Sequence, residues 1–113
     1  MNRNRLLAAF ISHITNMVVH QILEKAIDSP EIAQSYKNEI KNSLTIAKSY
    51  RGRIHPLDNA LPSHDNREVR DKIIREVRTK LGRRMAKGYD NIDISLIEDF
   101  VDKALKDMKV IED

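Results

Sequence analysis

The chain has no cysteine among its 113 residues. This absence excludes a disulfide framework, a thiolate zinc site and a thiol nucleophile. Glycine and proline are scarce, with three of each, and aromatic residues make up only 4%. Because short strands need turn formers and aromatic residues, this composition favours helices. No stretch of about 18 uninterrupted apolar residues occurs, so we expect no transmembrane helix and a cytoplasmic protein.

Apolar residues make up 41% of the chain and charged residues 33%, which is typical of a soluble globular protein. The length predicts one helical domain over residues 1–113. Apolar residues recur at helical spacing in four segments, at about 5–27, 30–51, 66–87 and 94–111. The link between the first two is very short. The sequence therefore predicts an all-α fold, an antiparallel four-helix bundle.

Local signals mark the ends of these segments. Ser29 followed by Pro30 is typical of a helix start, and Gly52 after Arg51 indicates a helix end. Asp65, with an acid three residues later, predicts the cap of the third helix, and Gly88 predicts its end. The long connection between the second and third helices, residues 52–64, carries several apolar side chains. We expect this loop to pack on the core.

Two helices have more apolar surface than one small bundle needs. Of the 22 positions from Leu6 to Ile27, fourteen are apolar, and they cover roughly two thirds of the helix circumference. Such a helix is central, is covered by a loop, or pairs with a second copy. The last segment has a strict heptad seam formed by Ile94, Ile97, Val101, Ala104, Met108 and Ile111. Both features favour a homodimer or a subunit of a larger assembly.

Positive charge is concentrated in one segment. Residues 67–88 hold nine Lys and Arg against three acids, a local charge of +6, while residues 89–113 sum to −5. Clustered cations bind nucleic acid phosphates through counterion release. The candidate nucleic-acid-binding residues are Arg67, Arg70, Arg78, Arg83, Arg84 and Lys87, extended by Arg51 and Arg53. Contact with the DNA or RNA backbone, without strong sequence readout, is the expected mode.

The same charges have a second interpretation. Glu68–Lys72, Asp71–Arg75 and Glu76–Lys80 are acid-to-base pairs four residues apart, each worth roughly 0.2–0.5 kcal/mol of helix stability. On a helical wheel most of the remaining cations flank the apolar arc, where they would meet the acids Glu98, Asp102 and Asp107 of the last helix. The alternative function is therefore a helical scaffold or adaptor acting through protein contacts.

Histidines offer little chemistry. His13 and His20 lie about 10 Å apart along the first helix, too far for one metal ion, and His20 with Glu24 gives only two ligands. These residues and Asn16 are expected to form a solvated polar strip. His55 and His64 bracket the long loop, and with its arginines they form a weak candidate for RNA cleavage. We expect no enzyme, no cofactor, no metal site and no small-molecule substrate.

Overall fold

The computed structural model describes residues 3–54 and 63–111. Within these ranges it holds four α-helices and no strand: α1 (Arg3–Ala26), α2 (Pro30–Ile54), α3 (Ser63–Ala86) and α4 (Ile97–Asp107), with a short 3-10 helix, η1 (Ile94–Leu96), before α4. The predicted all-α class is confirmed for this part of the chain. The loop residues 55–62 lie outside the described residues, so the predicted packing of the loop is not described.

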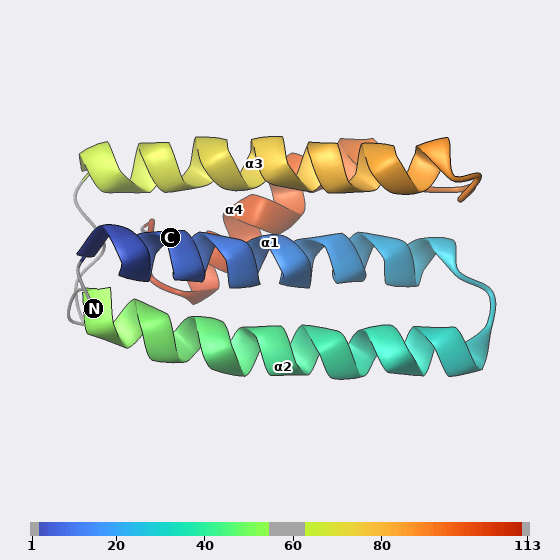
Figure 1. Ribbon diagram of the computed structural model, residues 1–113, viewed down its shortest axis with the longest axis horizontal. Coiled ribbons are helices and arrows are strands. Elements are labelled where there is room, and N and C mark those ends of the chain that lie inside the picture. Colours follow the sequence, from blue (N-terminus) through green and yellow to red (C-terminus); the bar gives the residue numbers. More distant parts are fainter. Residues whose placement is uncertain (1–2, 55–62, 112–113) are drawn as a thin grey trace.

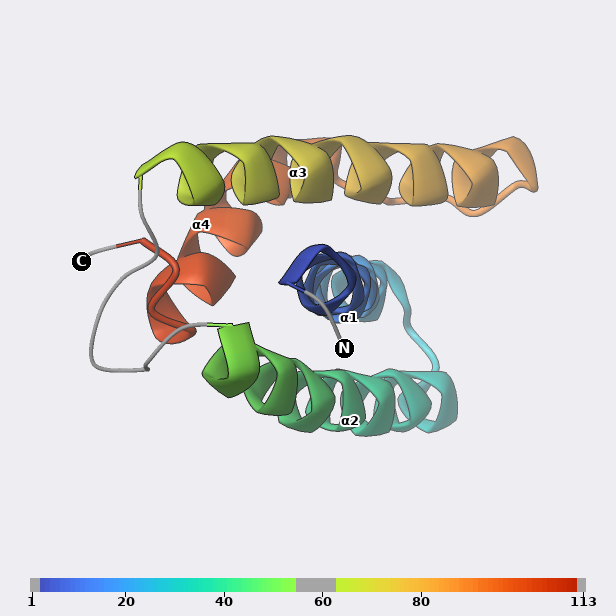
Figure 2. The ribbon, with the colours of Figure 1, turned by 60° about the vertical axis from the view of Figure 1, so that its left-hand side comes forward.

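The first helix lies at the centre of the molecule. α2 and α3 flank α1 on opposite sides, and α4 crosses on a third side (Figures 1 and 2). Phe10, Ile14 and Val18 of α1 are fully buried. Each such side chain contributes roughly 1.5–3 kcal/mol of hydrophobic free energy. The wide apolar face of α1 is thus buried against three helices of its own chain, the first of the three alternatives.

The second helix begins as predicted and ends later than predicted. Ser29 caps it, because the Ile32 amide donates to Ser29 Oγ at 3.4 Å. Gly52 does not end the helix, which continues to Ile54. Glycine costs about 1 kcal/mol inside a helix. That cost is outweighed here because Arg51 is buried and Ile54 packs against the core on either side of Gly52.

The third helix begins earlier than predicted. Its first residue is Ser63, so Asp65 lies inside the first turn, where it forms an ion pair with Arg3 of α1. The predicted capping role of Asp65 is wrong. The predicted end is confirmed: Gly88 has a φ of +96°, and the Tyr89 amide donates to the Arg84 carbonyl at 3.2 Å. This is a Schellman ending, in which glycine takes the left-handed position without a steric penalty.

The last helix is shorter than the predicted 94–111. It ends at Asp107, and Lys109 takes a positive φ of 56° so that the Val110 amide reaches the Leu105 carbonyl at 2.8 Å. The heptad seam is buried at its four central positions, Ile97, Val101, Ala104 and Met108, within the same chain. Ile94 lies outside the helix in η1 and is 54% exposed. Most of the seam is therefore buried within one chain, and Ile94 is its exposed position among the described residues.

Candidate nucleic-acid interface

The eight cations predicted from the sequence do not share one surface. Two of them, Arg51 and Arg53, lie two residues apart near the end of α2 but have opposite environments. Arg53 is exposed and lies 5.7 Å from the centroid of the Tyr50 ring. Arg51 is fully buried, with none of its surface accessible. A nucleic acid phosphate therefore cannot reach Arg51.

Arg51 instead holds the end of α4. Its Nε donates to the Met108 carbonyl at 3.0 Å and its Nη2 to the Lys109 carbonyl at 2.7 Å. Burial lowers the pKa of the guanidinium, because desolvation disfavours the charged form. The sequence carried a signal for this role. Arg51 is four residues from Ala47 and seven from Leu44, so it lies on the inward stripe of α2.

Three of the five cations in the N-terminal part of α3 are bound to acids. Arg70 donates to both carboxylate oxygens of Asp102 in α4, at 2.7 and 3.3 Å. This hydrogen-bonded pairing raises the pKa of Arg70. Arg78 Nη2 lies 3.9 Å from Glu98 Oε1, and Lys72 Nζ lies 3.5 Å from Glu68 Oε1. The expectation that the acids of the last helix meet the flanks of the basic helix is confirmed for Glu98 and Asp102, within one chain.

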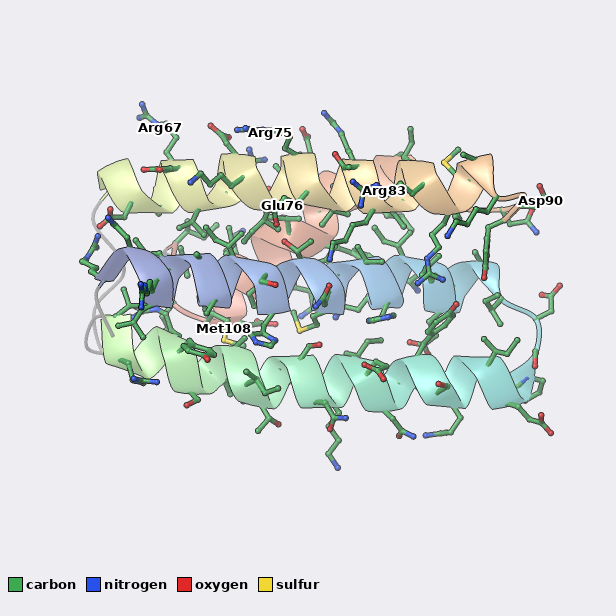
Figure 3. The ribbon with its side chains drawn as sticks, viewed as in Figure 1. Arg67, Arg75, Glu76, Arg83, Asp90 and Met108 are labelled. Atoms are coloured by element: carbon green, nitrogen blue, oxygen red, sulfur yellow. The ribbon has the colours of Figure 1, made fainter. Side chains whose placement is uncertain are left out.

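The other two predicted pairs within α3 do not form. Glu76 accepts a hydrogen bond from the buried Thr15 at 3.2 Å, and Lys80 donates to Asn16 at 2.9 Å, so both side chains tie α3 to α1. No ion pair joins Asp71 to Arg75 in the described part of the chain. Arg67 and Arg75 are exposed and point away from the bundle (Figure 3). Asp107 pairs with Lys103 of its own helix at 3.5 Å, not with α3.

The C-terminal part of α3, with the turn that follows it, differs from the N-terminal part in having cations but no acids. The ten residues from Lys80 to Tyr89 contain four cations, Lys80, Arg83, Arg84 and Lys87, and no acid. We call these four the basic end. None of them forms an ion pair with an acid among the described residues. Arg84 lies 5.5 Å from the centroid of the exposed Tyr89 ring. Cations are favoured at a helix C-terminus by the dipole, by about 0.3–1 kcal/mol each, which partly offsets their mutual repulsion.

The polar strip of α1 is half-buried, which corrects the expectation of a solvated strip. His13 stacks on Tyr50 of α2, with ring centroids 5.7 Å apart, and His20 lies 5.5 Å from Tyr36. Burial is the largest cause that lowers the pKa of His20; Arg84 and Lys80 lower it further, and Glu39 opposes them. In the described ranges no three potential metal ligands cluster together. His55 and the side chain of His64 lie outside the described residues.

Comparison with known proteins adds no assignment. The chain matches no known family model, no curated protein and no solved structure. One helix of the described part, α1, is long and apolar enough to cross a membrane by length and composition, and 56% of its most apolar stretch is buried inside the bundle. The functional argument therefore rests on the residues themselves.

Proposed function

We propose that this protein is a small, non-enzymatic accessory protein that binds the backbone of DNA or RNA through the basic end of α3. One observation carries the proposal: Lys80, Arg83, Arg84 and Lys87 have no acidic partner in the described part of the chain, whereas Arg70, Lys72 and Arg78 of the same helix do. Cations without an acidic partner can exchange solvent counterions for phosphates, and Arg83 and Lys87 are the exposed members of this set.

The proposed contact has little means of reading sequence. The basic side chains are point or fork donors to phosphate oxygens, which carry no base information. Tyr89, 40% exposed, lies beside Arg84 of the basic end, and a single ring gives a weak stacking platform. Arg67, Arg75 and Arg53 are exposed too, but they lie outside the basic end. We expect binding that depends on salt more than on sequence.

A second candidate is a helical adaptor whose basic end pairs with an acidic protein. Exposed apolar groups beside the cations favour it, because Met85 and Tyr89 are 45% and 40% exposed. Aromatic residues, methionine and arginine are enriched in protein interfaces. An antiparallel bundle, a homodimer or larger assembly and a cytoplasmic location remain part of the proposal. The short connection between α1 and α2 supports the antiparallel course. The exposed apolar side chains of the described residues, Ile32, Ile46, Met85, Tyr89 and Ile94, support the homodimer.

Fluorescence anisotropy of labelled duplex DNA and single-stranded RNA tests the proposal, at about 50 and 200 mM salt. Four phosphate contacts give a slope that lowers the affinity on the order of a hundredfold across this range. Saturable binding with that slope supports the nucleic acid interface. Absence of binding at the lower salt overturns it. Binding to an acidic polypeptide under the same conditions would then favour the adaptor.

A further inference from the structure

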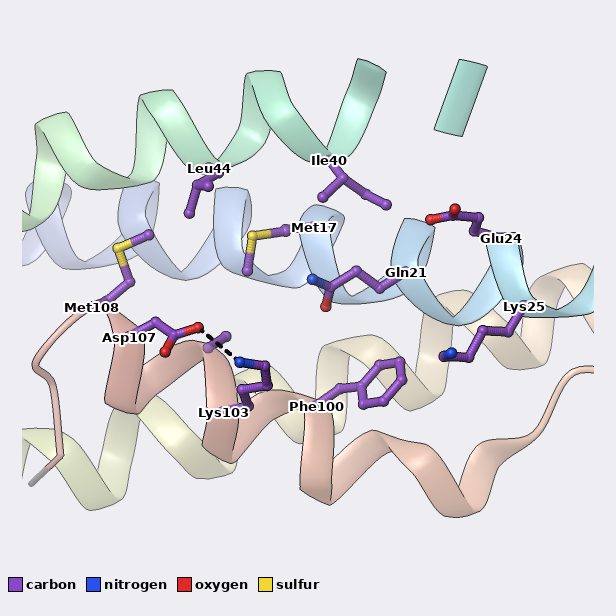
Figure 4. Close-up of a pocket in the computed structure, with 11 residues that line it drawn as sticks. Met17, Gln21, Glu24, Lys25, Ile40, Leu44, Phe100, Lys103, Asp107 and Met108 are labelled. Atoms are coloured by element: carbon purple, nitrogen blue, oxygen red, sulfur yellow. Dashed lines mark ion pairs between the residues drawn. The ribbon is translucent and has the colours of Figure 1, made fainter. Parts of the chain in front are cut away.

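A cavity of about 480 Å³ lies between α1, α2 and α4, away from the basic end of α3. Its walls are largely apolar: Met17 comes from α1, Ile40 and Leu44 from α2, Phe100 from α4, and Met108 from the position just after α4 (Figure 4). Pockets of 300–1,000 Å³ with apolar walls and a few polar groups are typical of small-molecule sites. The thioethers of the two methionines can adapt to the shape of a bound chain.

The buried arginine of α2 shapes one end of this cavity. Arg51 holds the carbonyls of Met108 and Lys109, so it fixes the end of α4 against the end of α2. Met108, whose side chain lines the cavity, is thereby placed at the end opposite Lys25 (Figure 4). The N–H donors of a guanidinium have fixed positions in one plane, so they hold the two carbonyls at a fixed spacing. These hydrogen bonds therefore fix one end of the cavity.

Among the described residues, the charged groups at the rim of the cavity are paired with opposite charges, except for one lysine. Lys103 is paired with Asp107 at 3.5 Å, and Glu24 is 3.8 Å from Lys37 of α2. Lys25 has no acidic partner in the described part of the chain, and its Nζ lies 5.9 Å from the centroid of the Phe100 ring. An apolar cavity with one unpaired ammonium at its end complements a molecule with an apolar body and an anionic head.

We propose that this cavity binds a single-chain anionic amphiphile of the fatty-acid class, with its carboxylate at Lys25 and its chain directed along α1 towards Met17 and Met108. Two helical turns separate Met17 from Lys25, a rise of about 12 Å. That distance suits a chain of medium length in an extended conformation. This site is independent of the nucleic acid proposal, because it shares no residue with the basic end.

Isothermal titration calorimetry with decanoate, below its micelle concentration, tests the site. Decyltrimethylammonium, which carries the same chain with a cationic head, is the matched probe. Leu44→Trp fills the cavity from α2 and should weaken decanoate binding by roughly tenfold or more. Lys25→Gln removes the charge from an exposed position without threatening the fold. This change should weaken decanoate binding roughly three- to fivefold.

Lys41→Gln is the control for the charge change, because Lys41 is an exposed lysine on α2 that does not line the cavity. Saturable binding of one decanoate, weakened by both cavity variants and unchanged in the control, supports the proposal. Three results overturn it: no saturable binding of decanoate, equal binding of the cationic probe, or equal losses in Lys25→Gln and Lys41→Gln. Circular dichroism of each variant establishes that it is folded.

Discussion

Residues 63–89, which are α3 and the turn after it, have two parts that both carry several cations and differ in how acids are placed around them. Residues 63–79 hold five cations and four acids, and Arg70, Lys72 and Arg78 form ion pairs. Residues 80–89 hold four cations, no acid and no ion pair in the described part of the chain. The local charge of +6 is therefore not one surface. It is a part with three paired cations, two of which attach α4 to α3, followed by a part without ion pairs, in which Arg83 and Lys87 are exposed and Lys80 donates to Asn16 of α1.

This difference separates two uses of the same residue types. A cation paired with an acid inside the fold contributes to the position of a helix, and its charge is largely cancelled for any outside ligand. An unpaired cation contributes little to stability but keeps its attraction for phosphates. Substitution of a paired cation should therefore lower the free energy of unfolding, whereas substitution of an unpaired cation should weaken binding to polyanions.

Arg51 and Arg53 of α2 give the largest expected contrast. Arg51→Ala removes the two hydrogen bonds to the carbonyls of Met108 and Lys109 and leaves a buried void, so it should lower the free energy of unfolding by about 2–4 kcal/mol. Arg53→Ala, at an exposed position, should change it by less than about 0.5 kcal/mol. Urea denaturation measures both. Equal stability of the two variants would contradict the structural role of Arg51.

Arg70 and Arg83 extend the contrast to α3. Arg70→Ala removes the two-point contact with Asp102, which is about one third exposed, and should lower the free energy of unfolding by about 1 kcal/mol. Arg83→Ala should leave stability nearly unchanged and weaken polyanion binding. Denaturation and anisotropy on the same two proteins provide the check. A destabilised Arg83→Ala would mean that Arg83, like Lys80, is tied into the fold.

Gly82 lies inside α3, within the basic end, and an added methyl group would meet no atom within 4 Å. Gly82→Ala should raise the free energy of unfolding by roughly 0.5–1 kcal/mol, because alanine loses less backbone entropy in a helix. Affinity for nucleic acid should be unchanged, since no charge moves. Thermal unfolding followed by circular dichroism measures the gain; a loss of stability would mean that this turn of α3 is not a regular helix.

His20 should give the smallest effect. Its pKa is lowered in the folded protein, so the unfolded chain binds a proton more readily as pH falls through about 6.5. Stability should therefore decrease on acidification from pH 7.5 to 5.5, before most carboxylates titrate. His20→Leu should flatten this part of the profile. Urea denaturation at several pH values tests the point, and an identical slope in the variant would exclude His20 as its source.

Much of the fold follows from sequence patterns because the signals are local. The breadth of the apolar face predicted that α1 needs several neighbours, and Gly88 and Ser29 marked helix ends through their own backbone and side-chain chemistry. The ends of α2 and α4 were not predicted correctly. They depend on a contact between Arg51 and two carbonyls 57 and 58 residues away. A backbone carbonyl carries no residue signature, so no sequence pattern identifies it as a partner.

The positions of the cations in the candidate site were also predicted only in part. Helical spacing placed Arg70 and Arg78 beside the acids of α4, which the structure bears out at Asp102 and Glu98. The prediction that Arg51 lies on the surface is wrong, because charge favours exposure but its position on the inward stripe of α2 leads to burial. The cavity between α1, α2 and α4 could not be predicted, because it depends on how obliquely α4 crosses α1, which the apolar pattern does not determine.

Anisotropy of a labelled DNA duplex at about 50 mM salt, with two charge-reversal variants, tests the central claim most directly. One variant carries Arg83→Glu and Lys87→Glu in the basic end, and its matched control carries Arg67→Glu and Arg75→Glu, two exposed arginines in the acid-rich part of α3. The first should lose affinity on the order of a hundredfold and reduce the salt slope by about 2. The control should lose much less. Equal losses would show that the two parts of α3 bind alike, and would contradict the account.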